Sequence, residues 1–132
     1  MTKTIIVIDD DPDDIDIMQE AIQEFNPSFI CKSFTHANEA LKVLSKSDDG
    51  TPEYIFIDMN MPLVGGDKCL KAFRQNERFD STVITMISTS MPDNIATMLK
   101  NSGADFTFQK PSRFEALNTI LRSVFNSHRN PS

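Results

Sequence analysis

Several polar residues that could together transfer a phosphoryl group stand where apolar segments of the chain end. They are Asp9 and Asp10 after residues 5–8, Asp58 after residues 54–57, Ser88 after residues 83–87 and Lys110 after residues 106–108. In such a set one carboxylate can attack phosphorus, while a hard cation and an ammonium group neutralise the phosphoryl oxygens. These residue types make Asp58 a candidate nucleophile.

Three carboxylates in one cleft would need a positive partner. Two unit charges about 4 Å apart repel by roughly 4 kcal/mol at an effective dielectric constant of 20, so either protons or a cation must relieve the repulsion. Oxygen ligands suit Mg²⁺, which often shares an oxygen with a phosphate group. We therefore expect Mg²⁺, with Mn²⁺ as a possible substitute, at Asp9 and Asp10 beside Asp58.

An expected helix start explains other acidic residues near the N-terminus. In this interpretation Asp11 caps the helix, Pro12 is its first residue and Asp14 lies in its first turn. Asp9 and Asp10 precede the cap, so capping does not explain both of them. Three strand-end residues, each taken alone, would be ordinary turn or loop residues: Asp58, Ser88 and Lys110.

The elements that would position these residues alternate along the chain. Apolar runs typical of strands cover residues 5–8, 29–34, 54–57, 83–87 and 106–108. Apolar residues spaced three and four apart, as on one helix face, recur in residues 15–25, 37–44, 70–73, 95–99 and 114–124. Five βα units predict an α/β fold with a doubly wound, five-stranded parallel sheet and five helices. Ligands of such sheets collect outside the carboxyl ends of the strands, where the polar residues fall.

Two helix boundaries can be predicted more closely. Gly103 suits the C-terminal end of the fourth helix. Ser112, followed three residues later by Glu115, predicts a capped start for the fifth.

Length and charge limit the class of protein. The chain has 132 residues, of which 39% are apolar and 24% charged, as in an ordinary globular domain. We expect one domain over residues 1–132, with a core over about 4–125 and a frayed tail over 126–132. With 19 acidic and 13 basic residues the net charge is −6, which argues against binding to nucleic acid or to an acidic membrane surface.

The cysteines and the N-terminus predict a location. Cys31 and Cys69 form neither a CxxC motif nor a Cys/His cluster, and we expect two buried free thiols, with a disulfide as the alternative. The chain begins with a strand-like segment, without a signal peptide or the roughly 20 apolar residues of a membrane span. These features predict a cytoplasmic protein.

The dispersed motifs resemble those of the receiver domains of two-component response regulators. Residues 8–11, Ile-Asp-Asp-Asp, resemble the acidic cluster of that family, and residues 58–62, Asp-Met-Asn-Met-Pro, followed by Gly66, resemble the segment around its phosphorylated aspartate. Ser88, residues 103–104 and Lys110-Pro111 match its later motifs at similar intervals. The match covers about residues 4–125 and implies a flavodoxin-like (βα)5 fold of the stand-alone, single-domain type.

The resemblance implies how the phosphoryl group is handled. Asp58 would accept it from a phosphohistidine on a histidine kinase or phosphotransfer protein. Lys110 would pair with its oxygens, and Ser88 would move to hydrogen-bond it, which would switch the surface around the fourth helix and fifth strand. Such a protein catalyses its own phosphorylation and slow dephosphorylation and is not a turnover enzyme. The resemblance leaves the downstream target open and is compatible with a monomer or a weak dimer.

The metal ligands follow from the same resemblance. Asp9, Asp10 and Asp58 would hold Mg²⁺, directly or through water, together with the backbone carbonyl of Asn60.

Other positions would modulate the reaction. Asn60 and Ser90 lie at positions that tune dephosphorylation in the family, and Thr89 replaces a smaller residue, which would narrow access to the site. Thr107 stands where the family usually has an aromatic switch residue. Phe106 is adjacent to it but should point to the opposite face of the sheet.

Three other functions are alternatives. An interaction-only module would keep the fold without phosphorylation. A hydrolase of the dehalogenase type would need an acid two residues after the nucleophile, where Asn60 cannot serve as one. A flavin-nucleotide binder would need a phosphate-binding loop rich in Ser, Thr and Gly after the first strand, which carries acids here.

Overall fold

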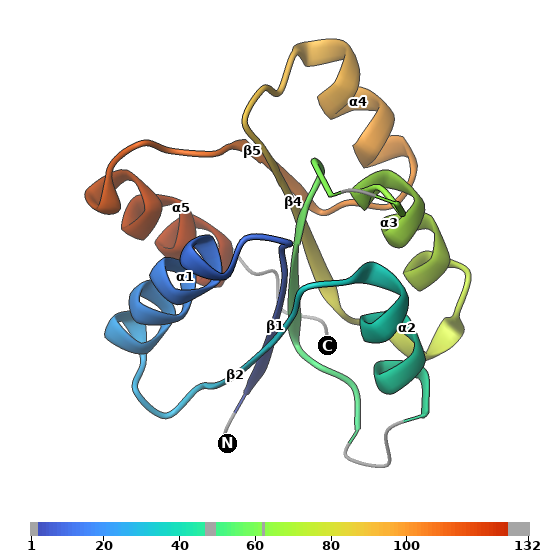
Figure 1. Cartoon of the computed structure of the whole chain (residues 1–132), viewed down its shortest axis with the longest axis horizontal. Helices are drawn as coiled ribbons and strands as arrows, with labels where there is room; N and C mark the ends of the chain where they lie inside the picture. The colour runs from blue at the N-terminus through green and yellow to red at the C-terminus, as the bar shows by residue number, and fades with distance from the viewer. Residues whose placement is uncertain (1–2, 47–49, 62, 127–132) are drawn as a thin grey trace.

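Five parallel strands form one sheet in the order β2-β1-β3-β4-β5 (Figure 1). The computed structural model describes residues 3–46, 50–61 and 63–126. Its strands are β1 (Thr4–Ile8), β2 (Ile30–Phe34), β3 (Tyr54–Asp58), β4 (Val83–Ser88) and β5 (Phe106–Gln109). The predicted fold class is confirmed. Pro62 of the aspartate motif and residues 127–132 of the expected tail lie outside the described residues.

Five helices connect and follow the strands. They are α1 (Pro12–Phe25), α2 (Ala37–Lys46), α3 (Gly66–Arg74), α4 (Asp93–Asn101) and α5 (Phe114–Asn126). A short 3-10 helix, η1 (Glu77–Phe79), precedes β4 and was not expected from the periodicity. Within the described ranges, no helix has both the length and the apolar character needed to cross a bilayer.

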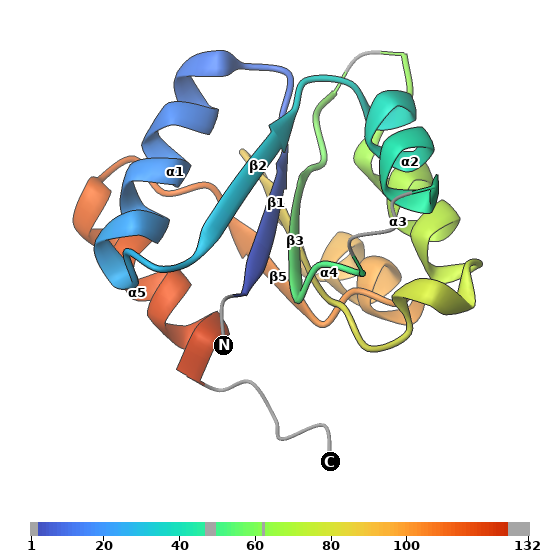
Figure 2. The same ribbon diagram turned by 90° about the horizontal axis from the view of Figure 1, so that it is seen from below.

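The helices cover the two faces of the sheet separately (Figure 2). Helices α1 and α5 lie on one face, and α2, α3 and α4 lie on the other. The central strand β3 supplies both cores because its side chains alternate: Tyr54 and Phe56 pack under α1 and α5, whereas Ile55 and Ile57 face the other helices. Burying a side chain of this size stabilises the fold by roughly 1.5–3 kcal/mol.

The strand order places the ends of β1 and β3 side by side. These strands pair directly, with Ile8 opposite Ile57, although β2 lies between them in the chain. The connection after β1 runs to one side of the sheet and the connection after β2 to the other, so β1 and β3 flank the switch point of the topology. Asp9 and Asp58 are therefore neighbours at the carboxyl edge of the sheet.

The expected helix boundaries have mixed outcomes. Asp11 caps α1 by accepting a hydrogen bond from the backbone N–H of Asp13, as predicted. Gly103 follows the end of α4 with a φ of +115°, which glycine adopts without strain. The Ser112 cap is wrong: α5 begins at Phe114, so Arg113 occupies the cap position and its carbonyl accepts the first helical hydrogen bond, from Leu117.

Both cysteines are free thiols, but only Cys69 is buried. Cys31 is half-buried because it lies on β2, an edge strand that the sheet covers from one side only. Burial raises the pKa of Cys69 to about 12 and that of Cys31 to about 11. Neither thiol is therefore an activated nucleophile at neutral pH.

Candidate functional site

Three carboxylates meet at the carboxyl edge of the sheet. Oxygen atoms of Asp9, Asp10 and Asp58 all lie within 4.8 Å of one another. Asp9 and Asp58 are buried, whereas Asp10 is exposed to solvent. A cluster of carboxylate oxygens with one open side is a donor set that fits a hard divalent cation such as Mg²⁺ or Mn²⁺.

The electrostatics of Asp9 favour a cation at this place. The pKa of the Asp9 carboxyl is raised to about 6, chiefly by burial and also by the negative charges of Asp58 and Asp14, although the Asp11 backbone N–H and Lys110 act in the opposite direction. The charged form of Asp9 is therefore destabilised in the protein without a metal. A bound divalent cation would stabilise that charged form.

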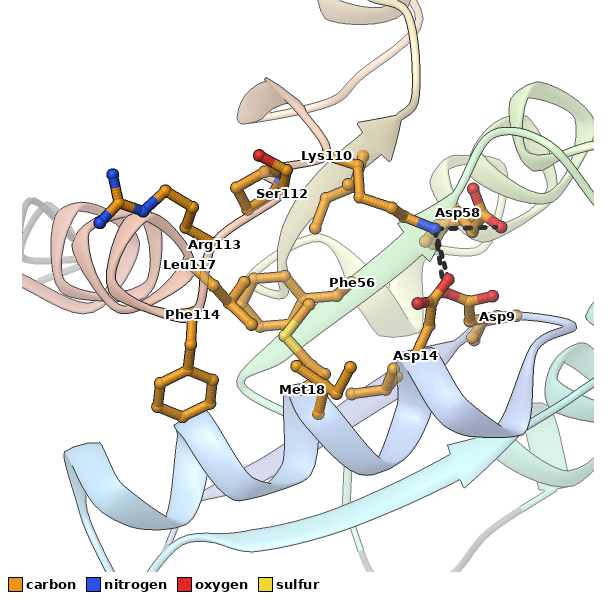
Figure 3. Close-up of a pocket in the computed structure, with 16 residues that line it drawn as sticks. Asp9, Asp14, Met18, Phe56, Asp58, Lys110, Ser112, Arg113, Phe114 and Leu117 are labelled. Carbon is orange, nitrogen blue, oxygen red and sulfur yellow. Dashed lines mark hydrogen bonds and ion pairs between the residues drawn. The ribbon is translucent and has the colours of Figure 1, made fainter.

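Lys110 reaches all the pocket-facing carboxylates of the site (Figure 3). Its Nζ lies 2.8 Å from Asp14, 3.5 Å from Asp9 and 3.9 Å from Asp58. The backbone N–H of Lys110 donates to the carbonyl of Ser88, which fixes the start of its loop beside β4. Burial lowers the pKa of Lys110, but the hydrogen bond to Asp14 and the surrounding negative charges outweigh this effect and raise it overall.

Asp14 is the site residue that the sequence did not reveal. It lies in the first turn of α1, as expected, but its carboxylate is also the nearest partner of Lys110. A helical pattern could have suggested this position. Met18 is buried under α1 beside the pocket, and residues four apart share a helix face, so Asp14 is directed to the same side.

Ser88 and Asn60 are joined across the ends of β4 and β3. The Ser88 hydroxyl donates to the side-chain oxygen of Asn60 at 2.9 Å, and the Asn60 backbone N–H donates to Asp58 at 3.1 Å. The Thr89 hydroxyl also reaches the Asn60 oxygen, at 3.3 Å, and the Ser90 backbone N–H donates to the Ser88 oxygen. These contacts bring three of the expected modulating positions, Asn60, Thr89 and Ser90, into one network with the Asp58 carboxylate.

Thr107 lies apart from this network, in the middle of β5. It pairs with Met86, which packs on the face covered by α2, α3 and α4. Phe106 and Phe108 stack on each other and pack on the opposite face, with α1 and α5. The expected orientation of Phe106 is confirmed. Because Phe106 and Phe108 both lie on the face opposite to Thr107, neither ring can take the place that an aromatic residue at position 107 would occupy.

Gly66 lets the start of α3 approach the end of β3. A Cβ atom on this residue would lie 2.5 Å from the carbonyl oxygen of Asp58 and 2.8 Å from the Cα of Met59. Only glycine avoids this overlap, so its position in the motif has a steric reason.

A pocket of about 370 Å³ opens beside the carboxylates, between α1 and α5 (Figure 3). Asp9, Asp14, Asp58 and Lys110 line its polar end. The remainder is mostly apolar and includes Met18, Phe56, Phe114 and Leu117. Asp58 and Lys110 therefore border the pocket, although only 6% of the surface of Asp58 is exposed.

Comparison with protein families gives one model match, to the response regulator receiver domain, over residues 5–122. Curated relatives include hybrid signal transduction histidine kinase D of Dictyostelium discoideum, 24% identical over 113 residues, which cover 86% of this chain and 7% of the kinase. Stress response regulator protein 1 of Candida albicans is 25% identical over 123 residues, 93% of this chain and 42% of that protein. The chain spans less than half the length of these relatives.

Solved structures share the fold at low sequence identity. The phosphorylated cyanobacterial phytochrome response regulator RcpA superimposes with a TM-score of 0.88 at 18% identity, with 100% of both chains covered. The Mn²⁺-bound form of response regulator Rcp1 gives a TM-score of 0.83 at 17% identity, with 98% of this chain and 99% of the other covered. Chemotaxis response regulator CheY4 of Vibrio cholerae gives 0.81 at 23% identity, with coverage of 94% and 99%.

Proposed function

This chain belongs to the response regulator receiver domain family, and on that premise we propose that Asp58 accepts a phosphoryl group as the input of a two-component or phosphorelay system. A carboxylate oxygen of Asp58 would form a bond to phosphorus. The bond between phosphorus and a donor histidine nitrogen would break, and that nitrogen would keep the electron pair. The product would be an aspartyl phosphate that alters the surrounding loops.

The observation that carries this proposal is the convergence around Asp58. Its side chain is buried beside Asp9 and Asp10, and the Lys110 ammonium lies 3.9 Å away. A lone buried aspartate could be a turn residue. A buried aspartate with two further carboxylates and a lysine instead provides a nucleophile, a cation site and a positive charge for the phosphoryl oxygens.

Asp9, Asp10, Asp58 and the Asn60 carbonyl would hold Mg²⁺, with Mn²⁺ as a substitute. When bound, the metal would neutralise charge on the phosphoryl oxygens. The protein residues would do the rest: Asp58 attacks, Lys110 pairs with an oxygen, and Gly66 keeps the backbone close enough to hold Asp58 in place.

The donor proposed is a histidine kinase or a phosphotransfer protein. The similarity to a hybrid histidine kinase and to stress response regulators supports a donor of this class. Phosphorylation would draw the Ser88 hydroxyl away from Asn60, and the change would spread to α4 and β5 through the loop that begins at Thr89. The protein would act as a switch that also dephosphorylates itself, and not as a turnover enzyme.

Phosphorylation by a small donor tests the proposal. Purified protein would be incubated with acetyl phosphate and Mg²⁺, and its intact mass would be measured. The wild type should gain one phosphoryl group, Asp58→Asn should gain none, and EDTA should prevent the gain. Asp80→Asn, which removes an exposed aspartate beside η1, is the control and should be phosphorylated like the wild type.

Labelling that persists in Asp58→Asn would overturn the assignment of the acceptor. An unlabelled wild type that also takes no phosphoryl group from any histidine phosphodonor would instead support the interaction-only alternative.

A further inference from the structure

Lys110 donates a hydrogen bond to Asp14 and not to Asp58, the proposed phosphoryl acceptor. The distance from Nζ to the Asp14 carboxylate is 2.8 Å, against 3.9 Å to Asp58. Only the shorter contact is a hydrogen bond. It joins residues 96 positions apart in the chain and links the first turn of α1 to the loop between β5 and α5. Figure 3 shows the Lys110 side chain extended toward these carboxylates.

We propose that Asp14 is a positioning residue that holds Lys110 until a phosphoryl group arrives at Asp58, and that it thereby limits the affinity of the site for that group. This inference rests on the function proposed above. Asp14 touches neither the donor nor the transferred group in this role. It acts through Lys110 alone.

The charges at the site give the direction of the effect. The Lys110 ammonium is one compact charge, and the N–H that donates to Asp14 is not available to a phosphoryl oxygen, so Asp14 and the phosphoryl group compete for Lys110. A phosphoryl group also carries up to two negative charges and is repelled by nearby carboxylates. Both effects make Asp14 a competitor of the phosphorylated state, and removing its charge should favour that state.

A purely local role for Asp14 is the alternative. Acidic residues in the first turn stabilise a helix through its dipole, and Asp13 occupies the same turn. Asp13 is exposed and forms no ion pair with Lys110. The two neighbours therefore differ in the contact with Lys110 while they share charge and helix position, which makes Asp13→Asn a matched control.

Binding of beryllium trifluoride, a phosphoryl analogue, measures the effect directly. Titration by NMR at saturating Mg²⁺ would compare the wild type with Asp14→Asn, Asp14→Glu and Asp13→Asn. Asp14→Asn should bind the analogue roughly three- to fivefold more tightly, the upper part of the range for an exposed ion pair. Asp13→Asn should stay within about twofold of the wild type, and Asp14→Glu, which can still reach Lys110, should resemble it.

The same substitution in a Lys110→Gln variant distinguishes two effects of Asp14: its hold on Lys110 and its direct repulsion of the phosphoryl group. In Lys110→Gln protein the gain from Asp14→Asn should fall to less than half, because the held ammonium is gone. An equal gain in both backgrounds would overturn the holding role, as would an unchanged or weaker affinity in Asp14→Asn. A wild type that binds no analogue at all would instead overturn the proposed function, so the two failures are distinguishable.

Discussion

The Ser88 hydroxyl donates a hydrogen bond to the side-chain oxygen of Asn60, 2.9 Å away, across the ends of β4 and β3. Asn60 therefore has two separable parts. Its side chain accepts from Ser88 and Thr89, while its backbone N–H donates to Asp58 and its backbone carbonyl is the proposed metal ligand.

Replacing Asn60 by alanine should separate these parts. Asn60→Ala keeps the backbone carbonyl, so the dissociation constant for Mg²⁺ should stay within about twofold of the wild type, whereas Asp10→Asn removes a charged ligand and should weaken binding at least about tenfold. Isothermal titration calorimetry measures both. Asn60→Ala should also lower the free energy of unfolding by about 1 kcal/mol, since buried Ser88 loses an acceptor. Similar Mg²⁺ affinities for the two variants would count against the proposed ligand set.

Gly66→Ala should damage both the fold and the site. The new Cβ would overlap the Asp58 carbonyl oxygen and the Met59 Cα, which are backbone atoms that cannot move aside cheaply. We expect a loss of about 2–3 kcal/mol in the free energy of unfolding, measured in urea, with weaker Mg²⁺ binding. Gly65→Ala is the control: its Cβ would lie close only to the Asp67 side chain, at 2.9 Å, which can turn away, while the Met59 carbonyl oxygen would be at an ordinary contact distance of 4.0 Å. Equal losses in the two variants would contradict this steric account.

The residues that gather at the carboxyl edge of the sheet could be predicted because parallel strands end at the same edge. Each apolar run predicted a buried strand, and the polar residue after it had to lie at the carboxyl edge. Asp9, Asp58 and Lys110 came together for this reason. Their types then predicted a cation site, which the cluster of carboxylate oxygens fits.

Contacts between distant side chains could not be predicted in the same way. Helical spacing indicates the side of α1 on which Asp14 lies, but its hydrogen bond to Lys110 depends on the angle at which α1 leaves β1 and on the path of the loop after β5. Neither of these leaves a local pattern in the sequence. The prediction that Ser112 caps α5 was wrong because the helix begins at Phe114, one residue later than a cap at Ser112 requires. Cys31 is only half-buried because its strand lies at an edge, a fact of topology and not of local sequence.

Thr85→Val should stabilise the protein. Thr85 is 1% exposed on β4, and its hydroxyl has no hydrogen-bond partner among the described residues. Valine has nearly the same shape, so the variant should gain about 1 kcal/mol in the free energy of unfolding. Thr82→Val is the matched control, since the equally buried Thr82 hydroxyl donates to the Pro52 carbonyl at 2.8 Å. Urea unfolding should show a loss of about 1–2 kcal/mol for that variant; a gain in both would show that the hydroxyl contact is irrelevant.

Asp9 should make the metal-free protein less stable as the pH rises. Its pKa is about 6 in the folded protein and 3.8 for an ordinary aspartate, so the folded state binds more protons between these values. The contribution of Asp9 to stability is therefore fully present below about pH 4 and is lost as the pH rises through 6. Asp9→Asn removes this dependence while its side-chain oxygen can still accept from the Asp11 N–H.

The difference between the Asp9→Asn variant and the wild type isolates this effect. In EDTA, the free energy of unfolding of the variant minus that of the wild type should increase by on the order of 1–3 kcal/mol between pH 4 and pH 7. Mg²⁺ should reduce the difference at pH 7, because the cation stabilises the charged carboxylate of the wild type. Asp16→Asn, which removes an exposed carboxylate from α1, controls for the loss of one charge. A difference that stays constant from pH 4 to pH 7 would show that burial does not destabilise the charged form of Asp9, and that a bound cation is not needed to relieve it.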